Sequence, residues 1–142
     1  MPIAVRRAAR AGQFAVGVGL WLWMAALFLA PAAMRPFCGF ICHQRPERSF
    51  FLPGGTQMPV CARCTGLYVG GALAFPLTLA AGASVSARRA RRVLALAALP
   101  TAVTWTLETA GAAAFSNAAR FAAALPLGCA AAWLVLGVLA DD

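Results

Sequence analysis

The chain has 142 residues, of which 62% are hydrophobic and 11% are charged. Soluble domains usually carry about a quarter charged residues, so this composition excludes an ordinary soluble protein and indicates an integral membrane protein. The net charge is +8, but the arginines stand in short clusters beside apolar segments. This pattern favours a lipid bilayer as the partner and no nucleic acid.

Four segments are long and apolar enough to cross a hydrocarbon core about 30 Å thick as helices. In chain order they are about residues 13–34, 65–83, 93–115 and 120–140. Each of the last three contains a proline, which kinks a transmembrane helix without ending it. The sequence therefore predicts an all-α fold with one membrane domain over residues 1–142, a four-helix transmembrane bundle with a cysteine-rich outer loop at residues 35–64.

The first segment also has features of a secretory signal peptide. The basic stretch RRAAR precedes an apolar run that ends in the small residues APAA. The run from Phe14 to Ala30 is longer than the usual signal-peptide core of about 7–15 residues, so we expect this helix to be retained.

The arginines beside the segments predict the orientation of the chain, because cytoplasmic loops carry an excess of basic residues. More arginines flank the side with both termini than the side with the long loop. We therefore expect a multi-pass protein of a bacterial or archaeal cytoplasmic membrane, with both termini in the cytoplasm and residues 35–64 outside. The inner set is Arg6, Arg7, Arg10, Arg88, Arg89, Arg91 and Arg92, and the outer set is Arg35, Arg45, Arg48, Arg63 and Arg120.

The long loop contains four of the five cysteines and the only histidine. A loop of this size cannot bury enough surface to hold a shape unaided, so it needs a disulfide, a metal or packing against the bundle. Cys61 and Cys64 form a C-x-x-C motif where the second segment begins, and the free N–H groups of a helix start favour thiolate. Two four-ligand sets are open: Cys42, Cys61 and Cys64 with either His43 or Cys38.

Sulfur-rich tetrahedral sites suit zinc first, with iron or copper as softer-metal alternatives. The spacing C-x3-C-H-x17-C-x2-C is similar in kind to a short zinc knuckle, although it is not a standard zinc-finger spacing. Disulfides or thiol redox chemistry stay open, as do reduced structural thiols, because cysteines outside the cytoplasm seldom remain free. A c-type haem is disfavoured, since no histidine directly follows the C-x-x-C motif.

The stretches CHQRPERSF from residue 42, PVCARCTGLYVG from residue 59 and SNAAR from residue 116 form a recognisable set. Together they resemble the bacterial and archaeal membrane-protein family catalogued as domain of unknown function 2085. The resemblance implies a small multi-spanning protein without an assigned activity. Cys38 lies outside these motifs, which favours the ligand set with His43. The residues carried over from the motifs are Cys42, His43, Arg48, Ser49, Cys61, Arg63, Cys64, Thr65, Gly66, Asn117 and Arg120.

Glu108 is the only acidic residue inside a predicted span. A carboxylate within the membrane is costly and indicates either a function, such as a metal or proton relay, or an ion pair, here with Arg120 or Arg63. We expect Glu108 and Arg120 to lie on facing sides of the last two segments. Arg48 and Arg63 also have a functional interpretation, in which they bind an anion, a lipid headgroup or a partner near the cysteines.

Small residues predict where the helices approach one another. Gly66 and Gly70 form a G-x-x-x-G pair that serves close packing in the bundle or in a dimer, so a homo-oligomer or a larger membrane complex stays open. Cys129 lies among alanines in the last segment, and we interpret it as a small packing residue.

Two functions fit these patterns. The first is a metal-binding membrane module, in which the cysteines and His43 hold zinc or a similar ion. The alternative is an enzyme, a membrane thiol–disulfide oxidoreductase with Cys61 and Cys64 as the exchanging pair and Cys38 and Cys42 as the second pair. The histidine and the lack of a thioredoxin-like pattern count against redox chemistry, whereas the oxidising side of the membrane counts for it. The sequence leaves open whether the protein is an enzyme.

Overall fold

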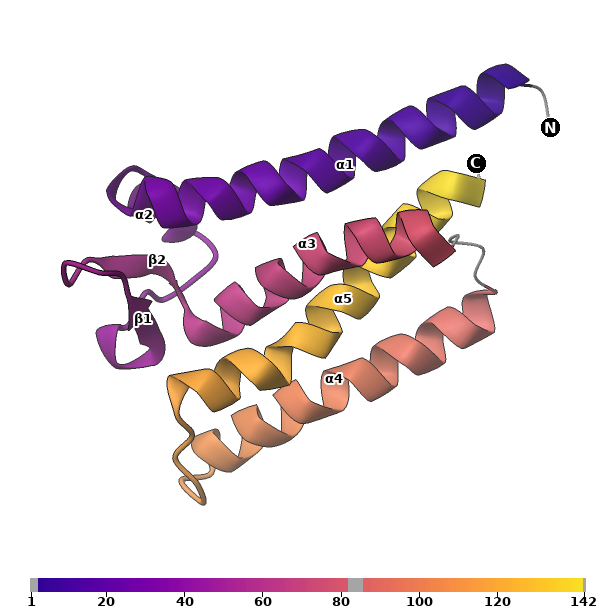
Figure 1. Cartoon of the computed structure of the whole chain (residues 1–142). Helices are drawn as coiled ribbons and strands as arrows, with labels where there is room; N and C mark the ends of the chain where they lie inside the picture. Colours follow the sequence, from indigo (N-terminus) through magenta and orange to yellow (C-terminus); the bar gives the residue numbers. More distant parts are fainter. Residues whose placement is uncertain (1–2, 82–85, 142) are drawn as a thin grey trace.

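The computed structural model describes residues 3–81 and 86–141, and this part of the chain is mostly helical (Figure 1). Within it, four long helices run beside one another, and a short helix and a two-stranded sheet lie at one end. The helices are α1 Ile3–Leu29, α2 Pro31–Cys38, α3 Ala62–Ala81, α4 Ala87–Thr109 and α5 Asn117–Asp141. A 3-10 turn, η1, covers Pro46–Arg48, and the strands are β1 Ser49–Phe51 and β2 Gln57–Cys61.

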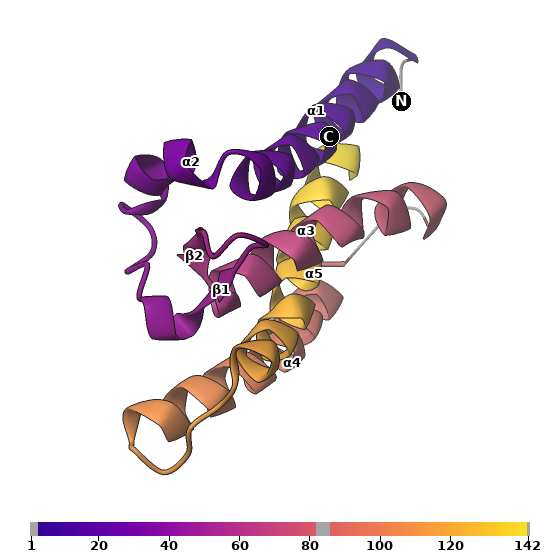
Figure 2. The ribbon, with the colours of Figure 1, turned by 60° about the vertical axis from the view of Figure 1, so that its left-hand side comes forward.

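The long helices are arranged with α5 between α3 and α4, while α1 packs against α3 and α5 (Figures 1 and 2). The cysteine-rich stretch, with α2 and the two strands, lies at one end of the long helices (Figure 1). The connection between α4 and α5 lies at that same end, and the start of α1 and the end of α5 lie at the other. This arrangement brings the third motif, at the start of α5, close to the first two.

Two helices of the described residues are long and apolar enough to cross a membrane. They are Arg10–Leu29, with a mean hydropathy of 1.7, and Asn117–Leu139, with a mean hydropathy of 2.1. Helix α4 is less apolar because several arginines occupy its first turns and Glu108 lies near its end. The mostly helical architecture is therefore confirmed, α1 and α5 are candidate membrane spans, and the four-helix transmembrane bundle stays a prediction.

The expectation of an all-α fold needs a correction in the cysteine-rich loop. Strands β1 and β2 form an antiparallel hairpin in which Ser49 pairs with Cys61 and Phe51 with Gln57. The turn between them contains Gly54 at φ 93° and Gly55 at φ 80°, a backbone region that only glycine adopts readily. The loop is also shorter than predicted, because its first residues belong to α2 and its last residues to α3.

Helix α4 ends at Thr109, earlier than the predicted residue 115. The cause is Gly111, which has φ 71° and therefore leaves the right-handed helical path. Its N–H donates to the Glu108 carbonyl at 3.2 Å, and the N–H of Ala112 donates to the Leu107 carbonyl at 2.9 Å. These are the two hydrogen bonds of a Schellman motif, which satisfies carbonyls at a helix C-terminus.

Helices α3 and α5 pack backbone against backbone at the glycine pair. Gly66 lies against the carbonyl oxygen of Phe121, and Gly70 lies against that of Leu125, so a Cβ at either glycine would collide with the α5 backbone. The pair therefore serves packing inside the chain. Cys129 lies at this interface and donates its thiol to the Gly70 carbonyl at 3.0 Å, in agreement with its predicted packing role.

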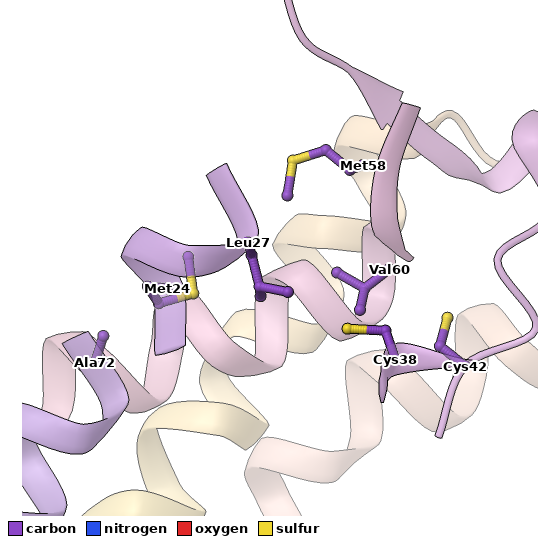
Figure 3. Packing of buried hydrophobic residues seen from close by; sticks show 7 residues of the cluster. All are labelled: Met24, Leu27, Cys38, Cys42, Met58, Val60 and Ala72. Carbon is purple, nitrogen blue, oxygen red and sulfur yellow. The ribbon is translucent and has the colours of Figure 1, made fainter. Parts of the chain in front are cut away.

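A buried apolar cluster fixes the cysteine-rich stretch to the helices (Figure 3). Leu27 of α1 and Val60 of β2 are fully buried in it, and Met58 is nearly so. Packing against the bundle, one of the three means that the sequence allowed, therefore contributes to holding the loop. The cluster comprises Met24, Leu27, Cys38, Cys42, Met58, Val60 and Ala72.

Candidate metal centre

Three thiols from three parts of the chain meet at the start of α3. Cys42 lies in the turn after α2, where its N–H donates to the Cys38 carbonyl at 2.9 Å. Cys61 ends β2, and Cys64 lies in the first turn of α3. Strand β2 continues directly into α3, so the C-x-x-C motif spans the junction of strand and helix. The Sγ atoms of Cys42, Cys61 and Cys64 all lie within 4.8 Å of one another.

This spacing fits a tetrahedral metal ion. Zinc–sulfur bonds of about 2.3 Å at tetrahedral angles hold sulfur atoms about 3.8 Å apart. Thiols that already lie within 4.8 Å of one another need to approach by about 1 Å or less to reach that distance. The three side chains therefore form a donor set for a thiophilic metal, with a fourth position left for another ligand.

The surroundings of Cys42 favour a negative charge on its sulfur. The backbone N–H of Cys61 points at the Cys42 Sγ, with 3.2 Å between nitrogen and sulfur. The thiols of Cys61 and Cys64, followed by backbone N–H groups, hold the pKa of Cys42 well below its usual range by stabilising the thiolate. The contacts around Cys42 therefore favour the thiolate, the form in which cysteine binds a metal.

The two residues proposed as fourth ligands lie outside this group of three thiols. Cys38 is fully buried, and in Figure 3 its sulfur points toward Leu27. Burial, and then the negative charge of Cys42, raise the pKa of the Cys38 thiol. His43 is exposed and lines the cavity into which the three thiols open. Neither residue has a ligand atom within 4.8 Å of all three sulfurs, among the side chains that the structure describes.

Gln44 fixes the backbone next to Cys42, a role that the sequence did not reveal. Its φ is 50°, which is unusual for a residue other than glycine. Its side-chain amide donates to the carbonyls of Arg35, at 2.6 Å, and Pro59, at 3.0 Å. The Gln57 amide in turn donates to the Gln44 carbonyl at 2.7 Å. These bonds join the turn after α2 to β2 and so hold Cys42 against Cys61. The only sign of this role in the sequence was the place of Gln44 in the first motif.

A cavity of about 350 Å³ opens beside the thiols. Arginines contribute much of its wall, and they come from the turn η1 and the residue before it, from α3 and from α5. The exposed side chains of Ile41 and Trp105 provide apolar wall. Trp105 is a second residue of the site that no pattern in the sequence indicated. The lining residues are Ile41, Cys42, His43, Gln44, Arg45, Arg48, Cys61, Arg63, Cys64, Trp105 and Arg120.

Glu108 forms ion pairs with two of these arginines. One carboxylate oxygen lies 2.7 Å from Arg63 Nη2, and the other lies 2.7 Å from Arg120 Nη2. The side chain of Glu108 is only 5% exposed, and it also accepts the backbone N–H of Phe115 at 3.3 Å. The expected pairing of Glu108 with Arg120 is confirmed, and Arg63, the other candidate, binds the same carboxylate. Glu108 is not part of the thiol group.

The remaining motif residues connect α5 to the hairpin and β2 to α3. Asn117 donates from Nδ2 to the Ser49 carbonyl at 2.9 Å and accepts from Arg120 Nη1 at 2.7 Å. Ser49 is buried and donates its hydroxyl to the Arg45 carbonyl at 2.8 Å. Thr65 donates to the Cys61 carbonyl at 3.1 Å, at the junction of β2 and α3. These residues therefore position the cavity wall and the C-x-x-C motif.

Comparisons with known proteins place these residues in a family. The family described as "Predicted membrane protein (DUF2085)" matches residues 42–134. An uncharacterised protein of Methanothermobacter thermautotrophicus is 34% identical over 89 residues, which cover 63% of this chain and 78% of that protein. An uncharacterised protein of Methanocaldococcus jannaschii is 63% identical over 30 residues, which cover 21% of this chain and 19% of that protein. No solved structure matches the chain significantly.

The family match begins at Cys42 and extends into α5, so it contains the thiol group, the arginines of the cavity and Glu108. It supports the resemblance that the three sequence motifs indicated. The chain belongs to the membrane-protein family of domain of unknown function 2085.

Proposed function

We propose that this membrane protein binds one metal ion through Cys42, Cys61 and Cys64, and that the ion is zinc. The observation that carries the proposal is the convergence of three thiols from three separate elements to within 4.8 Å. A metal ion that binds all three sulfurs would hold them together as thiolates and offset the repulsion between their charges. Three thiolates form a soft donor set that suits zinc first, and iron or copper next.

The fourth ligand in this proposal is His43. Its side chain lines the cavity that the thiols face, and it is exposed and therefore free to turn. Cys38 is the alternative ligand, but its thiol is buried in the apolar cluster and would have to leave it. The metal would join the turn after α2, the hairpin and α3.

The site is proposed to lie on the outer side of the cytoplasmic membrane, where the arginine distribution predicts residues 35–64. A metal there would reinforce the packing that holds the loop, and a partly exposed ion facing a cavity suits a protein that delivers or senses metal. Zinc sites closed by four protein ligands are usually structural, so delivery of the metal would require release of the exposed ligand His43.

Elemental analysis of the detergent-purified protein tests the proposal. We expect close to one equivalent of zinc, and loss of that metal in the variants Cys42→Ser, Cys61→Ser and Cys64→Ser. Cys129→Ser is the matched control, because Cys129 lies at the α3–α5 interface away from the site. A comparison of His43→Ala with Cys38→Ser decides the fourth ligand.

Alkylation of the same samples separates metal from disulfide. Thiols that bind a metal react only after chelation, whereas thiols in a disulfide react only after reduction. Protein without metal whose thiols need reduction would overturn the proposal.

That result would support a second candidate, a membrane thiol–disulfide oxidoreductase. The observation in its favour is the contact of the Cys61 N–H with the Cys42 sulfur at 3.2 Å, directly beside the C-x-x-C motif, because such a donor favours a reactive thiolate. In this alternative Cys61 and Cys64 exchange with a substrate thiol. The buried position of Cys38 counts against it, since Cys38 would have to pair with Cys42.

A further inference from the structure

The cavity beside the thiols has an excess of positive charge. Four arginines line it: Arg45, Arg48, Arg63 and Arg120. Among the described residues, both ion pairs of these arginines end on one carboxylate, that of Glu108. Four positive charges and one negative charge leave an excess of three.

The excess belongs to the arginines and Glu108 themselves. A divalent metal held by three thiolates would carry a net charge of minus one and would leave the cavity positive. The inference below therefore goes beyond the proposed metal site and does not require it.

Two of the four arginines are held in place by Glu108, and the other two have guanidinium groups available to bind a ligand. Glu108 fixes Arg63 and Arg120, whose side chains are 14% and 12% exposed. The Nε–H of Arg63 is buried without a hydrogen-bond partner among the described residues. The guanidinium groups of Arg45 and Arg48 make no hydrogen bond within that part of the chain, although both line the cavity. The cavity wall thus offers N–H donors without partners among the described residues, some on the fixed Arg63 and others on Arg45 and Arg48.

The shape of the cavity adds a second requirement. Its volume of about 350 Å³ lies in the range of pockets for small organic ligands, about 300–1,000 Å³, and exceeds the need of a bare inorganic anion. Ile41 and Trp105 supply apolar surface beside the arginines. Guanidinium groups bind phosphate through paired N–H donors, and the face of a tryptophan suits an apolar or aromatic group.

We infer that this cavity binds a phosphate ester, with the phosphoryl group on Arg45, Arg48 and Arg63 and the organic part against Ile41 and Trp105. The ester can come from a phospholipid headgroup or from a soluble compound, and both share this chemistry. The ligand would lie next to the thiol group and His43, which line the same cavity.

Titration calorimetry on the full chain in a neutral detergent tests the inference with two probes. Phenyl phosphate represents the soluble ester, and a short-chain phosphatidic acid in the same micelles represents the lipid. Phosphatidylcholine, which has no net charge, is the control lipid. Binding of phenyl phosphate assigns a soluble ligand, binding of phosphatidic acid alone assigns a lipid, and binding of neither overturns the inference.

Variants locate the binding. Arg45→Gln and Arg48→Gln should each weaken binding about tenfold or more, because each removes charge-assisted hydrogen bonds to the phosphate. Among the described residues neither side chain makes a hydrogen bond or ion pair, so both variants should fold. Arg35→Gln is the matched control, since Arg35 lies in the same region of the chain but does not line the cavity. An equal loss in Arg35→Gln would also overturn the inference.

The metal content of each sample separates this inference from the proposed function. Phosphate-ester binding that persists in metal-free Cys61→Ser supports the phosphate site whatever the fate of the metal proposal. Protein that contains metal and binds neither probe refutes the phosphate site alone.

Discussion

Glu108 should be the most sensitive position of the site to loss of charge. Its carboxylate is 5% exposed and lies 2.7 Å from both Arg63 and Arg120, whose side chains are 14% and 12% exposed. Glu108→Ala would leave two nearly buried guanidinium groups without an anion. Removing one partner of a buried ion pair typically costs about 3–5 kcal/mol, much of it from the charge left behind, and we expect a loss of that size.

The shared carboxylate also predicts an order of effects. Arg120→Gln leaves Glu108 paired with Arg63, so it should cost less than Glu108→Ala. Exchanging Glu108 and Arg120 should be no milder than Glu108→Ala, because an arginine at position 108 would face Arg63. The free energy of unfolding can be measured by titrating the protein from a mild detergent into SDS while following tryptophan fluorescence.

Glu47→Gln is the control for this series, because Glu47 is exposed and forms no ion pair among the described residues. Its effect should stay within about 0.5 kcal/mol, as for most surface substitutions. The reasoning is refuted if Glu108→Ala is as mild as Glu47→Gln, or if Arg120→Gln costs more than Glu108→Ala.

Three further predictions concern the helix packing, the hydrogen bonds of Gln44 and the membrane topology. Gly66→Ala should destabilise by about 1–3 kcal/mol in the same titration, because its Cβ would meet the α5 backbone, whereas Gly19→Ala, at an open position, should not. Gln44→Ala removes two side-chain hydrogen bonds that support a backbone with φ 50°, so it should lower the metal content found by elemental analysis. An unchanged metal content would refute the role of Gln44 in positioning Cys42. Reporter fusions after residues 50 and 90 should be active in opposite compartments, and activity in the same compartment would refute the predicted topology.

The helices could be predicted from the sequence because their signal is local. Apolar composition over about 20 residues is sufficient to indicate a membrane helix. The end of α4 was misplaced because the apolar run continues past Gly111, and the positive φ of that glycine depends on the hydrogen bonds of the helix end. The hairpin was missed because its strands are short, although the glycines at 54 and 55 marked its turn.

The site was predictable in kind but not in geometry. A carboxylate in an apolar helix needs a cation, so a partner for Glu108 was expected. That it binds two arginines depends on the rotation of α3 and α5 about their axes, which the glycine contacts fix. The choice between Cys38 and His43 as the fourth ligand likewise could not be made from spacing alone, and among the described residues neither joins the group of three thiols. Helix α2 ends at Cys38, and only the turn that follows carries Cys42 to the C-x-x-C motif.

The bonds from α5 to the hairpin also bear on how the protein is made. Asn117 donates to the Ser49 carbonyl, and Arg120 donates to that of Glu47, so α5 holds residues that are synthesised much earlier than itself. While translation has reached only α4, the cavity lacks Arg120 and Glu108 lacks its second cation. The site therefore reaches its final form only after α5 has been made and has packed against α3 and α4, which makes an intact cavity a marker that α5 is in place.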